Sequence, residues 1–190
     1  MGTTLPENQQ QIADNLYAVT RILEKKGIPY VLEGGTLLGA IRENRFLPWD
    51  DDVGIAVPAE LFFDQMEALV QELTNSGFIA GYRDNTFENC KINVHRDDAR
   101  FELLGWYARG SWRRRTRYRM PRKFLEERTR INFFGYDFYC PKDFVKYLRH
   151  FYGNWKVPKK SGRFFTFYCF DQKKFWNKQI RKVFPFIPRI

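Results

Sequence analysis

GGTLLGAIRENRFLPWDDDVGIAVP, residues 34–58, is the most informative stretch of this 190-residue chain. The apolar residues 30–32 predict a short strand that runs into Gly34 and Gly35, and residues 36–41 predict a short helix. Glycines at such a junction let the backbone approach a ligand closely, and the start of the helix aims free N–H groups at it. The pattern is therefore typical of a phosphate-binding turn, although most Gly-Gly pairs are turns without a ligand.

Three consecutive aspartates, Asp50, Asp51 and Asp52, follow in the same stretch. Like charges this close repel one another, so the cluster is costly unless a cation lies there. On a strand, residues two apart point the same way, and we therefore expect Asp50 and Asp52 to converge on one ion. Carboxylate oxygens suit Mg²⁺ or Mn²⁺. The alternative is a solvated acidic turn or a helix cap.

Apolar spacing predicts the remaining elements. Helices are expected where apolar residues recur every three or four positions, and strands where they alternate or form short runs. The segment 109–130 is rich in arginine and poor in aliphatic residues, so we expect a loop with some helix there. Helices are predicted over 5–26, 59–75 and 141–153, strands over 53–57, 78–82, 90–95 and 100–106, and a hairpin or bent strand over 133–140. Short strands interleaved with helices indicate an α+β or α/β domain.

Charge is divided unevenly along the chain. Residues 1–100 carry 9 basic and 16 acidic side chains, and residues 101–190 carry 23 basic and 6 acidic ones, which gives net charges of −7 and +17. Such an asymmetry indicates an anionic partner. Hydrophobic residues make up 44% of the chain and aromatic residues 18%, which is enough for a packed core and argues against a disordered chain. No apolar run approaches the roughly 20 residues of a membrane span.

Much of the basic charge lies between residues 109 and 130, where ten Lys and Arg side chains are interleaved with Trp112 and Tyr118. Arginine binds phosphate through two parallel hydrogen bonds, so we expect this segment, with Arg113 and Arg115, to bind a phosphorylated donor or acceptor. A solvated charged loop is the second alternative. A nucleic-acid surface is the third and least favoured one.

The tail and the cysteines bear on location. Residues 157–190 mix Lys and Arg with Phe and Trp, a composition that suits peripheral contact with an anionic membrane or, alternatively, a terminal helix packed on the domain. Cys90, Cys140 and Cys169 are odd in number and far apart, which argues for small buried thiols in a reducing compartment. We therefore expect a cytoplasmic protein whose tail is able to contact the inner face of the membrane.

Residues 34–42 (GGTLLGAIR) and 46–52 (FLPWDDD) together closely resemble the signature of the LicD/fukutin family. Two weaker similarities support this resemblance. Residues 101–107 (FELLGWY) resemble the strand that brings in a further carboxylate, and residues 147–155 (YLRHFYGNW) resemble a segment near the end of the family's domain. The resemblance covers residues 10–156. We therefore assign residues 1–156 to one domain and residues 157–190 to a basic, aromatic C-terminal extension.

The resemblance implies an α+β fold of the nucleotidyltransferase type, which is a mixed β-sheet with flanking helices. It also implies an enzyme that depends on Mg²⁺ or Mn²⁺ and transfers a phosphorylated group, of the phosphocholine or polyol phosphate type, from a CDP-linked donor to a hydroxyl of a glycan or glycolipid. Carried over onto this chain, it implies that Gly34, Gly35, Thr36 and Arg42 meet the nucleotide phosphates. It further implies that Asp50, Asp52 and Glu102 hold the metal, and that Asp51 or Glu102 accepts the hydroxyl proton.

One position departs from the family's pattern. The family typically has a further carboxylate two residues after the third aspartate, where this chain has Gly54. Asp50 or Asp51 substitutes for this ligand if the loop bends inward, with Glu102 reaching further than an aspartate would. Otherwise the protein is a catalytically weakened relative that binds nucleotide or anionic glycolipid. A nucleic-acid-binding module built on the basic half is the remaining alternative.

Overall fold

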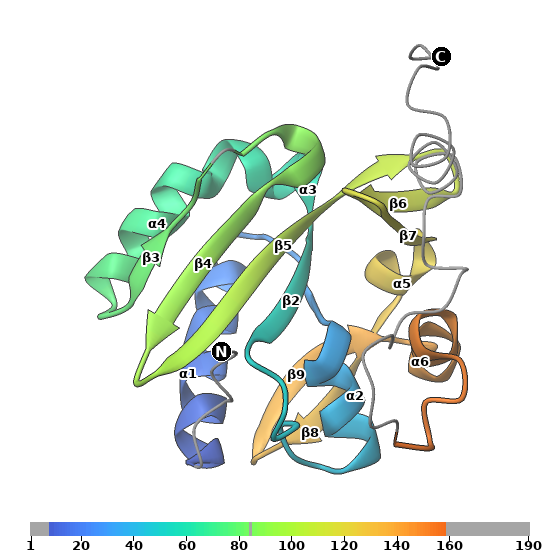
Figure 1. Ribbon diagram of the computed structural model, residues 1–190. Coiled ribbons are helices and arrows are strands. Elements are labelled where there is room, and N and C mark those ends of the chain that lie inside the picture. Colours follow the sequence, from blue (N-terminus) through green and yellow to red (C-terminus); the bar gives the residue numbers. More distant parts are fainter. Residues whose placement is uncertain (1–7, 84, 159–190) are drawn as a thin grey trace, which may run out of the picture.

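The computed structural model describes residues 8–83 and 85–158, and a mixed β-sheet forms its centre (Figure 1). Its main strands are β1 (Val31–Leu32), β2 (Val53–Pro58), β3 (Ile79–Gly81), β4 (Lys91–Arg96) and β5 (Ala99–Arg109). They lie in the order β1-β2-β5-β4-β3, with β2 and β5 parallel and the other neighbours antiparallel. This arrangement confirms the predicted mixed sheet of an α+β fold.

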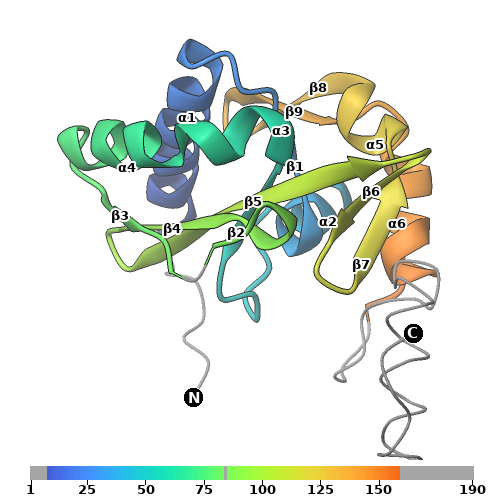
Figure 2. The same ribbon diagram turned by 90° about the horizontal axis from the view of Figure 1, so that it is seen from above.

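Helices cover one face of the sheet. Figure 2 shows α1 (Gln9–Lys25) and α4 (Met66–Asn75) on that side, together with the short helix α3 (Ala59–Phe62). The face of β4 and β5 that is turned toward the viewer in Figure 1 carries no helix among the described residues. Two further helices, α2 (Gly34–Arg42) and α6 (Phe144–Tyr152), flank the other end of the sheet. The sheet therefore has one packed face and one face on which a site can form.

The predicted helices exist, with changes at their ends. Ile12, Leu16, Val19 and Leu23 of α1 are all buried, as their spacing predicted. The cap of α1 is Asn8, whose side chain accepts a hydrogen bond from the Gln11 N–H, and the predicted start of this helix at residue 5 lies outside the described part. The predicted helix 59–75 is divided into α3, a 3₁₀ turn and α4. No helix in the described ranges has the length and apolarity that a membrane crossing requires.

The segment 109–130 is mostly strand, so the prediction of a loop with some helix was wrong. β6 (Trp112–Arg115) and β7 (Tyr118–Pro121) form a hairpin that extends the sheet from the end of β5, and α5 (Lys123–Glu126) follows it. The cross-strand pair Arg113 and Met120 is buried. Because an arginine fills one of these inward positions, the apolar alternation that marks a strand is absent from the sequence.

A second hairpin, β8 (Arg128–Phe133) and β9 (Tyr136–Pro141), forms a separate two-stranded sheet. It confirms the hairpin predicted over 133–140, although its first strand begins earlier. Phe46 packs against this hairpin, with its ring centroid 4.9 Å from that of Phe133 and 5.6 Å from that of Phe134. Cys90 and Cys140 are buried thiols as predicted, and Cys169 lies outside the described residues.

Candidate metal and phosphate site

A cavity of about 450 Å³ opens on the half of the molecule where α2, α6 and the β6–β7 hairpin lie (Figure 1). Its lining is mainly apolar, with a small number of charged groups, as is usual for ligand sites. The aromatic side chains that line it are Trp49, Trp106, Tyr118, Tyr147, Phe151, Tyr152 and Trp155. The charged ones are Glu33, Arg42, Asp50, Asp51, Asp52 and Arg115.

The acidic loop, residues 50–52, lies directly before β2 and supplies three of these charges. One carboxylate oxygen from each of Asp50, Asp51 and Asp52 lies within 4.8 Å of the other two. The N–H of Asp50 donates to the Leu47 carbonyl over 3.0 Å, which fixes the loop at its start. We predicted that Asp50 and Asp52 converge, and the structure brings Asp51 to the same point.

Gly35 allows the acidic loop to pack on α2. A Cβ atom at position 35 would overlap the carboxylate of Asp50, so any other residue would displace it. Asp50 therefore lies against the first turn of α2, where the helix dipole favours negative charge. The glycine at this position thus serves the placement of a carboxylate as well as the close approach of a ligand.

Burial and mutual repulsion make the acidic loop hard to ionise. Burial raises the pKa of Asp50 to about 6, and the Asp51 charge contributes in the same direction. Burial also raises the pKa of Asp52, with further contributions from the Glu102 and Asp50 charges. A cation beside such carboxylates favours their charged forms and offsets this cost.

Arg100 of β5 and Lys91 of β4 supply part of that positive charge. Nη2 of Arg100 lies 3.2 Å from Oδ2 of Asp51 and 3.8 Å from Oδ1 of Asp52. Nζ of Lys91 lies 3.0 Å from Oε1 of Glu102, and Nε of Arg100 lies 3.7 Å from the same oxygen. Glu102 therefore stands beside the acidic loop, as expected, but it is held by two cations and does not line the cavity.

The oxygen cluster fits a hard divalent cation. Three carboxylate oxygens within 4.8 Å of one another form the type of donor set that Mg²⁺ and Mn²⁺ accept. Mg²⁺ usually takes one or two carboxylates and completes its shell with water and substrate phosphates, so not all three aspartates are needed as ligands. The raised pKa values of Asp50 and Asp52 show that the nearby cations do not compensate for burial and for the neighbouring carboxylates.

The glycine turn is less open to phosphate than we expected. Gly34 has a φ of +62°, and its N–H donates to the Tyr147 hydroxyl over 3.3 Å. The hydroxyl of Thr36 accepts a hydrogen bond of 2.9 Å from the Gly54 N–H. Thr36 is buried and is not part of the cavity lining, so it ties α2 to β2. Gly34 and Gly35 do line the cavity.

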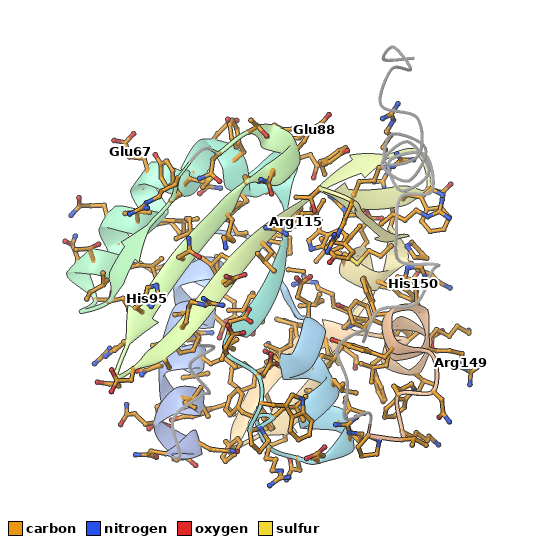
Figure 3. The ribbon with its side chains drawn as sticks, viewed as in Figure 1. Glu67, Glu88, His95, Arg115, Arg149 and His150 are labelled. Carbon is orange, nitrogen blue, oxygen red and sulfur yellow. The ribbon has the colours of Figure 1, made fainter. Side chains whose placement is uncertain are left out.

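The predicted arginines separate into two groups. Arg42 and Arg115 line the cavity, and Figure 3 shows Arg115 beside the upper part of β5. Arg42 donates to the Glu43 carboxylate and, through Nη1, to the Trp155 carbonyl over 3.1 Å. Nε of Arg115 is buried and has no hydrogen-bond partner in the part of the chain that the structure describes. Because Arg115 also lines the cavity, it is well placed to meet an anion there.

Arg113 belongs to the second group, because it is buried away from the cavity. Its Nη1 donates to the Trp106 carbonyl over 2.8 Å and to Glu60 over 2.6 Å. Its Nη2 donates to Glu126 over 3.0 Å. These bonds join β6, α3, α5 and β5, so the structure gives Arg113 a structural position where we had expected phosphate binding.

Glu33 is a charged residue of the cavity lining that we did not predict. It is 7% exposed and precedes the first turn of α2. Its Oε2 accepts a hydrogen bond of 2.8 Å from Nε1 of Trp106. Burial raises the pKa of Glu33 to about 7, against an opposing effect of Arg115. The sequence offered one indication, since Glu33 directly precedes the two glycines.

The two histidines lie outside the site, as structural or surface residues. Figure 3 shows His150 on α6 and His95 on β4, at different ends of the molecule. Nε2 of His150 lies 2.9 Å from the Arg119 carbonyl oxygen, and its ring centroid is 5.1 Å from that of Phe151. His95 is exposed on β4.

Three curated proteins are similar to parts of the chain. Lipopolysaccharide cholinephosphotransferase LicD of Haemophilus influenzae is 44% identical over 52 residues, which are 27% of this chain and 20% of that protein. Ribitol 5-phosphate transferase FKRP of Homo sapiens is 48% identical over 42 residues, or 22% of this chain and 8% of that protein. An uncharacterized protein of Rickettsia prowazekii is 25% identical over 147 residues, or 70% of this chain and 51% of that protein. The matches thus span about half or less of these relatives.

Two solved structures of the antibiotic-resistance factor ANT(2'')-Ia are distantly similar to the chain. The solution structure has a TM-score of 0.49 at 14% identity and covers 70% of this chain and 66% of that one. The crystal structure in complex with adenylyl-2''-tobramycin has a TM-score of 0.49 at 16% identity and covers 72% of this chain and 76% of that one.

The family model of the LicD/FKTN/FKRP nucleotidyltransferase domain matches residues 27–143, which is more than half of the chain. The matched part contains the glycine turn, the acidic loop, Glu102 and the β6–β7 hairpin, and it ends just before α6. The chain therefore belongs to the LicD/FKTN/FKRP nucleotidyltransferase domain family.

Proposed function

We propose that the protein transfers a phosphorylated group, of the phosphocholine or polyol phosphate type, from a CDP-linked donor to a hydroxyl of a glycan or glycolipid, with the help of a divalent cation. The observation that carries the proposal is the acidic loop. Its three carboxylate oxygens gather within 4.8 Å of one another at a cavity that Arg42 and Arg115 also line. Membership in the family fits a transferase, and the names of LicD and FKRP give the two types of group transferred.

Asp50 and Asp52 of the acidic loop, together with Glu102, would hold Mg²⁺ or Mn²⁺. The bound cation supplies charge neutralisation at the donor pyrophosphate. Arg100 and Lys91 hold Glu102 through contacts of 3.7 and 3.0 Å. These two side chains therefore orient the carboxylate that comes from the neighbouring strand.

The donor would lie in the cavity with its phosphates between the acidic loop and the arginines. Arg115 offers guanidinium N–H groups with the geometry that phosphate oxygens accept, and Arg42 adds a second positive charge. The aromatic residues Trp49 and Trp155 provide flat apolar surfaces against which a nucleobase packs. The surrounding lining is mainly apolar, and charge interactions are stronger beside apolar side chains than in bulk water.

The reaction we propose is an in-line displacement. The acceptor oxygen forms a bond to the distal phosphorus of the donor, the bond from that phosphorus to the bridging oxygen breaks, and CMP leaves. Asp51 accepts the hydroxyl proton. Asp51 is the exposed member of the acidic loop, so an acceptor reaches it from solvent. Among the described residues, Asp51 is paired with Arg100 alone, whereas Glu102 is paired with both Lys91 and Arg100.

The acceptor class and the location follow from weaker observations. LicD is named for lipopolysaccharide, which is a glycolipid. A cytoplasmic enzyme that modifies a lipid-linked glycan would meet it at the membrane surface, and the basic, aromatic tail suits that contact. The tail lies almost entirely outside the described residues, so this role and the division into a domain and an extension stay predictions.

Isothermal titration calorimetry tests the proposal, with CDP-choline and CDP-ribitol as ligands, in the presence and absence of Mn²⁺, followed by measurement of CMP release. We expect Mn²⁺-dependent binding of one donor and CMP release with a glycan acceptor. Asp52→Asn should abolish both, and Asp64→Asn, at an exposed position outside the cavity, should change neither. Tight binding of CDP without release would instead support a non-catalytic binder. Indifference to CDP together with salt-sensitive binding to RNA would refute both.

A further inference from the structure

Position 54 of β2 faces the acidic site. Gly54 is the register partner of Glu102 across the parallel pair β2 and β5. It is two residues from Asp52, and residues two apart on a strand point to the same face. A side chain at position 54 would therefore lie beside Glu102, on the side where Gly54 lines the cavity. Gly54 leaves that space to another residue.

Glu33 takes the space above Gly54. A Cβ atom at position 54 would lie 3.2 Å from Cγ of Glu33 and 3.3 Å from its carbonyl oxygen, which is tighter than ordinary contact. The two residues are also joined through the backbone, because the Glu33 N–H donates to the Gly54 carbonyl over 3.1 Å. Glu33 can therefore occupy this place only because residue 54 has no side chain.

The Glu33 side chain is fixed in this position. Its Oε2 accepts a hydrogen bond of 2.8 Å from Nε1 of Trp106, and the residue is 7% exposed and lines the cavity. Asp52 and Glu102 are close enough to interact with its charge. Carboxylates are seldom this buried unless they are paired or bind a metal. The charge of Arg115 favours the ionised form of Glu33, and the Trp106 bond engages Oε2, so Oε1 has no hydrogen bond within the described part of the chain.

We propose that Glu33 supplies, from the start of α2, the carboxylate that β2 lacks at Gly54, and that Glu33 is a ligand of the divalent cation together with Asp52. This inference rests on the proposed function, because it assumes that the acidic site binds a cation. Beyond the proposed function, it requires that the charge of Glu33 contribute to the affinity for the cation. The site would lose affinity for the cation on neutralisation of Glu33, and would regain it when the carboxylate is moved to position 54.

The test measures Mn²⁺ binding to the full chain by electron paramagnetic resonance of the free ion, which needs no enzymatic turnover. Glu33→Gln keeps the size of the side chain and an oxygen for the Trp106 N–H, and it removes only the charge. We expect it to weaken Mn²⁺ binding by at least about tenfold. Glu67→Gln is the matched control, since Glu67 is exposed on α4, far from Arg115 and the cavity (Figure 3), and should leave binding unchanged.

A second pair of variants tests whether the two positions are equivalent. Gly54→Asp alone should not tighten Mn²⁺ binding, because its Cβ would lie 3.2 Å from Cγ of Glu33. Glu33→Ala should weaken Mn²⁺ binding as Glu33→Gln does. Glu33→Ala combined with Gly54→Asp should restore the affinity to within about threefold of that of the unmodified chain. That limit separates recovery from the single variants, whose expected loss is at least about tenfold. Thermal unfolding of each variant shows that it is folded.

Three results would overturn the proposal, and they differ in what else they affect. If the unmodified chain does not bind Mn²⁺, the proposed function falls and this inference falls with it. If the unmodified chain binds Mn²⁺ and Glu33→Gln binds it equally well, only this inference falls, and Glu33 has a structural role with Trp106. If Glu33→Gln weakens binding and the double variant does not recover it, Glu33 does not stand in for a side chain at position 54.

Discussion

The acidic loop and the β6–β7 hairpin each contain several side chains of like charge. They differ in how far oppositely charged side chains of the protein neutralise them. In the hairpin, the buried guanidinium of Arg113 is bound by two carboxylates and one carbonyl. In the acidic loop, three carboxylates lie together with Arg100 as a shared cation, and the pKa values of Asp50 and Asp52 are raised chiefly by burial. The charge of Arg113 is thus balanced within the protein, whereas the acidic loop retains a deficit of positive charge.

This difference shows why the number of charges in a segment is a poor guide to its function. The hairpin is the more highly charged of the two regions, yet Arg113 uses its charge to hold the fold together, and Arg115 is the hairpin arginine that lines the cavity. The acidic loop has fewer charges, but its aspartates have only Arg100 as a basic partner among the ion pairs of the described residues. Charges that the fold leaves without a partner indicate a binding site, whereas paired charges stabilise the fold. The following predictions test this distinction.

The largest effect on folding is expected for Arg113→Met. The change removes the partner of two carboxylates and of the Trp106 carbonyl. Breaking a fully buried ion pair costs roughly 3–5 kcal/mol, and because Glu60 and Glu126 are more than one-third exposed we expect about 2–3 kcal/mol here. Urea unfolding measures it, with Arg109→Met, at an exposed position, as the control. A loss below about 0.5 kcal/mol, the size of an ordinary surface change, would contradict the structural role of Arg113.

The raised pKa values of Asp50 and Glu33 predict two opposite effects of pH. One concerns the stability of the metal-free protein, and the other concerns its affinity for the metal. The folded protein raises the pKa of Asp50 from 3.8 to about 6 and that of Glu33 from 4.5 to about 7. At these two carboxyls the folded state therefore holds more protons than the unfolded state, and their contribution to the free energy of unfolding of the metal-free protein falls as the pH rises from about 4 to about 7.

Metal binding should show the reverse trend, because the cation binds the ionised carboxylates and displaces their protons. We expect the affinity for Mn²⁺ to rise by about tenfold or more between pH 6 and pH 8. Calorimetry in buffers of different ionisation enthalpy detects the released protons. Affinity that is constant over this range would show that the acidic loop is already ionised without the metal.

An intermediate effect is expected for Arg115→Met. Because Arg115 lines the cavity and its buried Nε has no partner among the described residues, its loss should reduce donor binding. We expect affinity for CDP-choline or CDP-ribitol to fall by about tenfold, the size of a charged hydrogen bond, with little change in unfolding free energy. Calorimetry and urea unfolding on the same sample separate this variant from Arg113→Met. Equal donor affinity would place Arg115 with the structural arginines.

The smallest effect is expected for Arg100→Met. Arg100 lies 3.2 Å from Asp51 and 3.8 Å from Asp52, so it competes with a cation for the same oxygens. Its removal should tighten Mn²⁺ binding by about fivefold, which corresponds to an ion pair of about 1 kcal/mol. A loss of affinity would indicate that Arg100 is needed to orient the carboxylates, through Glu102, more than it competes for them.

Much of this account was predictable from sequence, because the relevant patterns are local. The apolar spacing of α1 follows directly from burial on one face, and the acidic loop is contiguous in the chain. The approach of Asp51 to the cluster was expected only on the condition that the loop bends inward, because residues 50–52 precede β2 and strand geometry does not place them.

The rest depends on partners that are distant in sequence. Arg113 is structural because Glu60 and Glu126 reach it, 53 and 13 residues away. Glu33 joins the site because a residue 21 positions later, Gly54, has no side chain, and because Trp106 holds it. No periodicity in the sequence reports such pairings. They appear only when the three-dimensional arrangement of these elements is known.

The central claim is that the acidic loop binds a divalent cation that the donor shares, and Mn²⁺ titration of the full chain tests it most directly. Electron paramagnetic resonance of free Mn²⁺ should show binding to the unmodified protein, tighter in the presence of the CDP-linked donor that it uses. Asp52→Asn should weaken that binding by at least about 100-fold, because a direct ligand is lost where outer-shell changes already cost about 10- to 100-fold. Equal Mn²⁺ binding by the unmodified protein and Asp52→Asn, or none by either, would contradict the claim.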